Sequence, residues 1–141
     1  MPMSAFIFQC VPDRFDLRRE LKPRHKDTWY ATRYRSLMKP GDLVFFWMAG
    51  DPQIRGLYGW GKLTSTAYFK PAWESHGVDV VCEYKFDRPL LASQIRSQPT
   101  LENMLILRAP QSTNFLLSDT ELSALTALIS EHGNPAPQHK S

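Results

Sequence analysis

Cysteine and histidine are scarce in this sequence of 141 residues, which contains two cysteines and four histidines. Two cysteines cannot form the disulfide framework of a small secreted protein or supply a complete zinc site. The histidines are scattered and do not show the spacing of metal ligands. We therefore expect Cys10 and Cys82 to be reduced, buried thiols, and we expect no metal and no other cofactor.

Long hydrophobic runs are also missing, since no apolar stretch approaches the roughly 20 residues of a membrane-spanning helix. The first residues lack the basic and then apolar succession of a secretory signal peptide. Together with the unpaired thiols, these features favour a cytoplasmic protein that does not associate with a membrane.

Familiar catalytic motifs are absent as well. The sequence has no G-x-S-x-G, no convincing histidine partner for either cysteine and no conspicuous pair of carboxylates. The segment 56–61 has the spacing G-x-x-G-x-G and is not followed by a helical pattern, so it does not match a nucleotide-binding loop. We interpret its glycines as permitting a β-bulge or a close approach of two backbones.

The sequence does contain the hydrophobic patterning of one globular domain rich in strands. Apolar runs predict strands over 5–10 and 43–48, and the second shows no alternation, which is typical of a strand covered on both faces. Glycine-interrupted residues 54–66 and aromatic residues 29–34 are expected to be extended. Strict alternation over 78–86 predicts a half-buried strand.

Helical patterns are short except at the C-terminal end. Short helices are expected over 15–21, with Asp13 as a possible N-cap, over 89–95 and over 101–105, and residues 109–115 read as a polar loop. Ser118 and Glu121 form the S-x-x-E pattern of a capping box, which predicts a helix that stops at Gly133. The single domain should therefore cover 1–133 and be followed by a flexible tail over 134–141.

Aromatic residues and positive charge are both well represented. Aromatics make up 12% of the chain and include four tryptophans, and this residue type fills cores but also stacks on bases. Residues 1–40 carry a net charge of +5, whereas the remainder carries −2. The basic segment is either a solvated face or a surface that attracts phosphates.

The order of motifs along the chain resembles the EVE domain family. The matching features of the central segment are Trp29, the turn Lys39-Pro40-Gly41-Asp42, the strand Val44-Phe45-Phe46-Trp47, the turn Ala49-Gly50 and the glycine-rich strand after Ile54. Residues 6–16 and the loop Leu107–Phe115 resemble the corresponding segments of EVE domains from modification-dependent restriction systems. The resemblance extends from about Phe6 to His132. Met48-Ala49-Gly50 departs from the frequent Arg-Ser-Gly, and Ser112 replaces a common glycine.

This resemblance implies an α+β fold, namely a PUA-like mixed β-barrel with short peripheral helices and a C-terminal helix, related to YTH and ASCH domains. It implies a binding module rather than an enzyme, which holds a modified nucleobase of DNA or RNA in an aromatic-walled pocket with a basic rim. Flipping a base out of its stack costs a few kcal/mol, which stacking at about 1–3 kcal/mol per base can offset. The implied partners are modified DNA or RNA and a separate nuclease or modification enzyme.

The resemblance also suggests which residues form such a site. The aromatic walls would be Trp29 and Trp47, lining one solvent-reachable cavity together with the loop 110–115. The expected polar contacts to the base come from Gln111, Thr113 and Asn114. The expected contacts to the nucleic-acid backbone come from Arg33, Arg35 and Lys39.

Other interpretations remain open at this stage. Each of the two tryptophans is equally consistent with core packing, Asn114 with a turn-stabilising role, and Trp60 and Trp73 with structural roles. An ASCH-like enzyme acting on modified nucleosides would need a catalytic cluster, for which the candidates Lys62, Glu83 and Lys85 are not convincingly grouped. A protein-interaction module without a nucleic-acid role is the third alternative.

Overall fold

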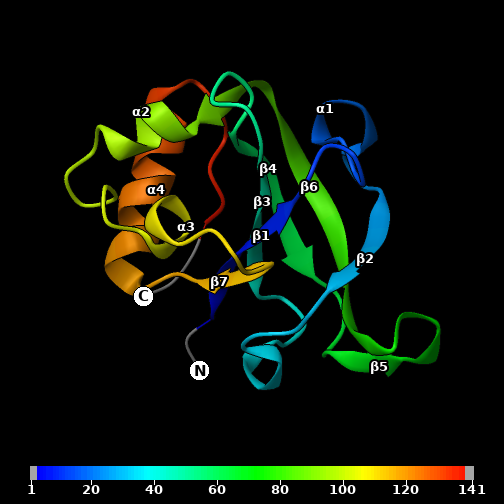
Figure 1. Cartoon of the computed structure of the whole chain (residues 1–141). Coiled ribbons are helices and arrows are strands. Elements are labelled where there is room, and N and C mark those ends of the chain that lie inside the picture. Colours follow the sequence, from blue (N-terminus) through cyan, green and yellow to red (C-terminus); the bar gives the residue numbers. More distant parts are fainter. Residues whose placement is uncertain (1–2, 139–141) are drawn as a thin grey trace.

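The computed structural model of the chain describes residues 3–138 and contains a seven-stranded sheet with short helices around it (Figure 1). The strands are β1 (Ala5–Cys10), β2 (Lys26–Tyr30), β3 (Leu43–Met48), β4 (Gly56–Leu63), β5 (Tyr68–Lys70), β6 (Ser75–Leu91) and β7 (Asn114–Leu116). The α-helices are α1 (Leu17–Glu20), α2 (Ala92–Arg96), α3 (Leu105–Arg108) and α4 (Asp119–Glu131), and the 3-10 helices are η1 (Arg35–Leu37) and η2 (Pro71–Trp73).

The sheet is mixed, and it curls into a half-barrel. Its strand order is β2-β6-β4-β3-β1-β7, with β5 added to β6. The pair β1–β3 is parallel and the other pairs are antiparallel. The expected mixed β-barrel with short helices and a C-terminal helix is therefore confirmed in its half-barrel form. Strands β2 and β7 end the order and do not pair with each other.

Apolar side chains form one core on each face of the sheet. Strand β3 shows why the run 43–48 has no alternation, because Val44, Phe46 and Met48 enter the core inside the half-barrel, whereas Leu43, Phe45 and Trp47 enter the core under the helices. Figure 1 shows α2, α3 and α4 gathered on that second side. The sheet is thus buried on both faces, and the remaining polar features concentrate at its edges.

The capping box at the start of α4 is confirmed. The Ser118 side chain accepts from the backbone N–H of Glu121, at 3.1 Å, and the Glu121 carboxylate accepts from the backbone N–H of Ser118, at 2.9 Å. The helix presents Leu122, Leu125 and Leu128 to the core. Helix spacing in the sequence is sufficient to place this element and its buried face.

Several expected elements need correction. The N-cap of α1 is Asp16 rather than Asp13, because the Asp16 carboxylate accepts from the backbone N–H of Arg18. The helix expected over 101–105 lies instead at Leu105–Arg108, and the strands β5 and β7 were not foreseen. Strand β7 forms within the expected polar loop because its partner is β1, far away in the sequence.

The segment after α4 runs back over the core under the helices. The Trp60 indole N–H donates to the Pro135 carbonyl, at 2.9 Å, and Ala136 packs against that core. This part of the expected tail therefore has defined contacts, while residues 139–141 lie outside the described residues.

The glycines of β4 permit close approach to β6. The register shifts between Leu57 and Gly59 and again between Trp60 and Gly61, and a Cβ on Gly61 would collide with the Val81 carbonyl. The structural interpretation of this glycine-rich strand is confirmed. Among the helices formed by residues 3–138, none has both the length and the apolar character needed to span a membrane.

Candidate functional site

The two edge strands β2 and β7 approach each other without pairing, and one side chain bridges them. The Asn114 carboxamide donates from Nδ2 to the Tyr30 carbonyl, at 2.9 Å, and its Oδ1 accepts from the Thr32 backbone N–H, also at 2.9 Å. Asn114 is 1% exposed and does not line the cavity described below. The carboxamide expected to address a base is therefore occupied by the backbone and latches the open half-barrel.

A cavity of about 390 Å³ lies along this seam, beside the Asn114 latch. Its walls come from the end of β1 and the following turn, from β2, from η2 and from the loop before β7. The lining residues are Gln9, Cys10, Val11, Arg14, Phe15, Asp27, Thr28, Trp29, Tyr30, Ala49, Trp73, Pro110, Gln111, Ser112 and Thr113. The cavity therefore occupies the gap that remains where a closed barrel would have paired strands.

Aromatic side chains form much of the cavity wall. Trp29 packs against Phe8, Phe15 and Phe46, with ring centroids 5.5–6.1 Å apart, so its indole is fixed in the core and borders the cavity. Tyr30 is 39% exposed and lies against Trp73, with centroids 4.5 Å apart. The expected position of Trp29 in a cavity wall agrees with the geometry.

Trp73 reaches the cavity from the arm that contains β5 and η2. The Lys70 ammonium lies 4.6 Å from the Trp73 ring centroid, so the ring is held between Lys70 and Tyr30. A Cβ on Gly77 would touch the Trp73 ring at 3.0 Å, which shows that the indole covers this glycine. The structural role expected for Trp73 is thus incomplete, because the same ring also lines the cavity.

Trp47 does not reach this cavity. It is 0% exposed in the core under the helices, whereas Trp29 belongs to the core inside the half-barrel. The prediction that both tryptophans line one cavity is therefore wrong. Successive side chains of a strand point to opposite faces, and because Phe46 contacts Trp29, its neighbour Trp47 must point away.

The polar wall is built by the loop 110–113 and by Gln9, which the sequence analysis did not identify. The Gln9 Nε2 donates to the carbonyls of Pro110, at 3.2 Å, and Ser112, at 2.8 Å, and thereby fixes the loop. Gln111 and Thr113, both expected at the site, line the cavity. These two hydrogen bonds hold the loop against β1, where its polar groups line the cavity.

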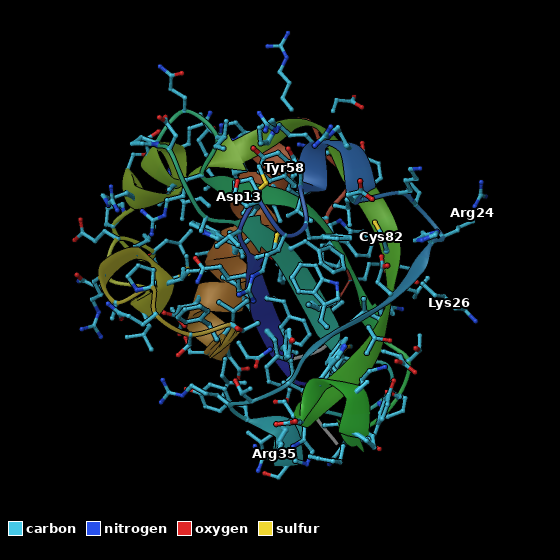
Figure 2. All side chains as sticks on the ribbon, turned by 45° about the vertical axis from the view of Figure 1, so that its right-hand side comes forward. Asp13, Arg24, Lys26, Arg35, Tyr58 and Cys82 are labelled. Carbon is cyan, nitrogen blue, oxygen red and sulfur yellow. The ribbon has the colours of Figure 1, made fainter. Side chains whose placement is uncertain are left out.

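The basic residues are distributed unevenly around the cavity. Arg14 lines it, and Arg33 lies at its rim, where Nη1 donates to the Ser112 Oγ at 3.2 Å. Arg35 is the first residue of η1, donates to the Thr32 carbonyl, and lies at the end of the molecule opposite Asp13 (Figure 2). Lys39 precedes β3, whose other end leads to the cavity at Ala49, so the structure does not bring Lys39 to the rim.

Comparison with known proteins agrees with this geometry. The model of the EVE domain matches residues 4–128. The chain belongs to the EVE domain family. None of the curated proteins matches it.

Solved structures share the EVE fold at low sequence identity. A hypothetical protein from Leishmania major has a TM-score of 0.77 and 16% identity, covering 94% of this chain and 98% of its own. A Pseudomonas syringae protein has a TM-score of 0.70 and 22% identity, covering 88% and 98%. Human THYN1, solved in complex with DNA containing 5-methylcytosine, has a TM-score of 0.69 and 18% identity, covering 94% and 99%.

The Cys10 thiol in the cavity wall of this EVE domain is not an activated nucleophile. Burial raises the pKa of the Cys10 thiol to about 12, so the thiol stays protonated and donates to the Phe15 carbonyl. Burial likewise raises the pKa of the Asp27 carboxyl. Lys62, Glu83 and Lys85 do not line the cavity, and Lys85 donates instead to the Arg18 carbonyl.

The described part of the chain contains no set of side chains that could bind a metal ion. Residues 3–138 contain no group of three or more histidine, cysteine or acidic side chains able to hold an ion. The lining offers aromatic faces, fixed polar groups and a basic rim, which are features that bind and orient a ligand.

Proposed function

We propose that this EVE domain binds a nucleobase of DNA or RNA in the seam cavity and prefers a modified base. The observation that carries the proposal is the cavity itself, in which Trp29, Tyr30 and Trp73 face a loop fixed by Gln9. Its volume of about 390 Å³ falls within the range of small-molecule sites, about 300–1,000 Å³. Human THYN1 was solved with DNA containing 5-methylcytosine, which supports the same ligand class here.

The physical basis is that a methyl group adds only a small apolar increment, about 0.8 kcal/mol for a buried carbon. Such an increment is sensed only where the walls fit closely and are already in place. Trp29 meets this condition because three aromatic rings pack against it. Tyr30 and Trp73, whose rings lie against each other at a tilt of 34°, both line the cavity and can receive the face of a base.

The binding test uses single-stranded oligonucleotides that differ only in one central base, either unmodified or methylated, and follows tryptophan fluorescence. We expect Tyr30→Ala to weaken binding by about tenfold, because stacking contributes about 1–3 kcal/mol per base. Phe69→Ala is the matched control, since Phe69 is 56% exposed and does not line the cavity. Equal loss in both variants would contradict the assigned site, and binding of no oligonucleotide would exclude the function.

Salt dependence tests the basic rim separately. We expect the logarithm of the association constant to fall with the logarithm of salt concentration, with a slope near −0.7 per phosphate contact on a single strand. Arg14→Ala and Arg33→Ala should weaken binding to all sequences alike, because phosphate contacts position a ligand and do not specify the base. Lys39→Ala removes the same charge away from the rim and should leave the slope unchanged. An affinity independent of salt would contradict the rim assignment.

A further inference from the structure

Strand β2 has one paired and one free edge, and the hydrogen bonds at its ends show which residues face which edge. The Ala31 N–H donates to the His76 carbonyl, at 3.0 Å, and the His25 carbonyl accepts from Cys82, at 3.1 Å. In an antiparallel pair, alternate residues direct both backbone groups to the partner strand. The odd-numbered residues of β2 therefore bond to β6, and the even-numbered residues direct their N–H and C=O groups away from it.

The Asn114 latch provides independent support for this alternation. It bonds to the carbonyl of Tyr30 and to the N–H of Thr32, both even-numbered, from the side opposite β6. The free edge of β2 thus faces the seam. Residues 27–30 all line the cavity, so the free edge of β2 that carries the backbone groups of Thr28 borders it.

The side-chain hydroxyl of Thr28 is already hydrogen-bonded, so only the backbone groups of this residue are free to bind a ligand in the cavity. Its hydroxyl donates to the Asp79 carboxylate on β6, at 2.8 Å. The backbone N–H and C=O of Thr28 remain, adjacent to each other on the free edge, and in residues 3–138 we find no partner for them. A backbone donor and acceptor that lose water when a ligand enters the cavity cost free energy unless the ligand supplies hydrogen-bond partners. The two groups therefore favour a ligand that has a matching acceptor and donor.

We propose that the backbone N–H and C=O of Thr28 read the Watson–Crick edge of the bound base, a role that rests on the proposed function. Every nucleobase carries one donor and one acceptor side by side on that edge, and flipped bases are commonly bound through it. The ligand class is therefore a base whose Watson–Crick edge is free and unpaired, with any modification elsewhere on the ring. An intact duplex is not bound unless the base is flipped, and a base alkylated on that edge is rejected.

Proline provides a substitution that removes the free-edge donor of Thr28, together with the side-chain hydrogen bond to Asp79. Thr28→Pro deletes the N–H without breaking a β2–β6 hydrogen bond, and proline is tolerated in an edge strand when its nitrogen faces away from the partner. Thr28→Val is one control, since it loses the bond to Asp79 and keeps the N–H. Lys26→Pro is the other, since Lys26 lies on the same edge and does not line the cavity.

The probes are single-stranded oligonucleotides with one variable central residue. In the first set, that residue is 5-methylcytosine, adenine or thymine, each with a free Watson–Crick edge. In the second set, it is the corresponding neutral base with a methylated edge: N4,N4-dimethyl-5-methylcytosine, N6,N6-dimethyladenine or 3-methylthymine. The third probe has an abasic site. We expect the best free-edge base to bind more tightly than its blocked form and than the abasic strand. Thr28→Pro should reduce that binding about two- to tenfold, the change for one hydrogen bond, and leave the blocked and abasic strands unaffected. Both controls should retain the wild-type ratio.

Amide exchange on the unmodified protein gives a second measurement that does not depend on a variant's folding. The amide protons of Thr28 and Tyr30 should exchange rapidly in the free protein, and that of Thr28 should become protected when the preferred free-edge oligonucleotide binds. The Trp29 amide, which donates to β6, should be protected in both states and serves as the internal reference.

The outcomes separate the two proposals. The edge-reading role is overturned if Thr28→Pro binds like the wild type, if Lys26→Pro weakens binding equally, or if the Thr28 amide stays unprotected in the complex. If Tyr30→Ala nevertheless weakens base binding as expected, the cavity still holds a base and only the edge assignment is wrong. If no base binds better than the abasic strand, the proposed function fails and the edge-reading role fails with it.

Discussion

Trp29 and Trp47 lie on opposite faces of the same curled sheet, and their surroundings differ. Trp47 is sealed under the helices, and the Arg55 guanidinium covers its ring at 5.5 Å. Trp29 is 8% exposed and sits where the edge strands β2 and β7 fail to pair. One ring is part of a closed apolar layer, and the other borders a gap bridged by polar side chains.

The comparison shows that the space for a ligand arises at the edge of this sheet rather than on either face. On each face of the sheet, the apolar side chains pack closely against one another, which leaves no space for a ligand there. At the seam, Asn114 and Gln9 hold neighbouring segments through hydrogen bonds to the backbone. Joining β2 and β7 through the Asn114 side chain instead of a strand pair leaves a cavity with both aromatic and backbone polar groups.

The largest effect is expected from removing Trp47. Trp47→Ala should lower the free energy of unfolding by about 3–5 kcal/mol, the usual cost of truncating a large buried aromatic side chain. Because the ring faces the helices, the folded fraction should still prefer the same oligonucleotide. Urea unfolding measures the loss of stability. Binding measured without urea, at a temperature where the variant is folded, tests whether the preference for the oligonucleotide is kept.

Trp29→Ala is the matched comparison for this prediction. It should also destabilise the protein, because Trp29 packs on Phe8, Phe15 and Phe46, and it should in addition remove the preference between modified and unmodified bases. If the folded Trp47 variant lost that preference while the Trp29 variant kept it, the assignment of the two faces to different roles would be wrong.

A smaller effect is expected from opening the latch. Asn114→Ala removes two hydrogen bonds to the backbone at the seam and should lower the free energy of unfolding by about 2 kcal/mol. Hydrogen exchange should accelerate at the Thr32 amide, which loses its acceptor, and remain slow at the Trp29 amide. Asn103→Ala is the control, since Asn103 is exposed and should change stability by less than about 0.5 kcal/mol. Unchanged exchange at Thr32 would show that Asn114 does not close the seam.

These differences also explain which features the sequence could reveal. The strand Ala5–Cys10 and the helix after Ser118 were predictable because their patterns are local, an apolar run in one case and a capping box with helical spacing in the other. The direction of Trp47 was not predictable, because a strand that is apolar at every position carries no alternation to distinguish its faces.

The candidate site was only partly predictable for a related reason. Trp29, Gln111 and Thr113 were identified through a family resemblance, and they line the cavity. Gln9 was missed because the pairing of β1 with β7, distant in the sequence, brings it to the loop before β7. Trp73 was missed because the pairing of β2 with β6 places its hairpin beside Tyr30. The free backbone of β2 has no sequence pattern at all, since it depends on which strand β2 lacks as a neighbour.

The smallest effects concern pH, and they should have opposite signs at the seam and at α1. Burial raises the pKa of Asp27 at the seam, whereas the hydrogen bond from the Arg18 side chain lowers the pKa of Asp16, the N-cap of α1. A group with a raised acid pKa binds protons more readily in the folded state, so its ionisation costs stability above that pKa. A group with a lowered pKa contributes stability that is lost as the pH falls through its folded value.

Asp27→Asn should therefore raise the free energy of unfolding at pH 7 relative to the wild type, and this gain should vanish as the pH falls below the ordinary aspartate range. Asp16→Asn should lower stability at pH 7, and this cost should vanish only at a still lower pH. Urea unfolding of both variants and the wild type between pH 7 and about pH 2 measures the two differences, and the same sign for both would mean that Asp27 is not held in a desolvated wall of the cavity.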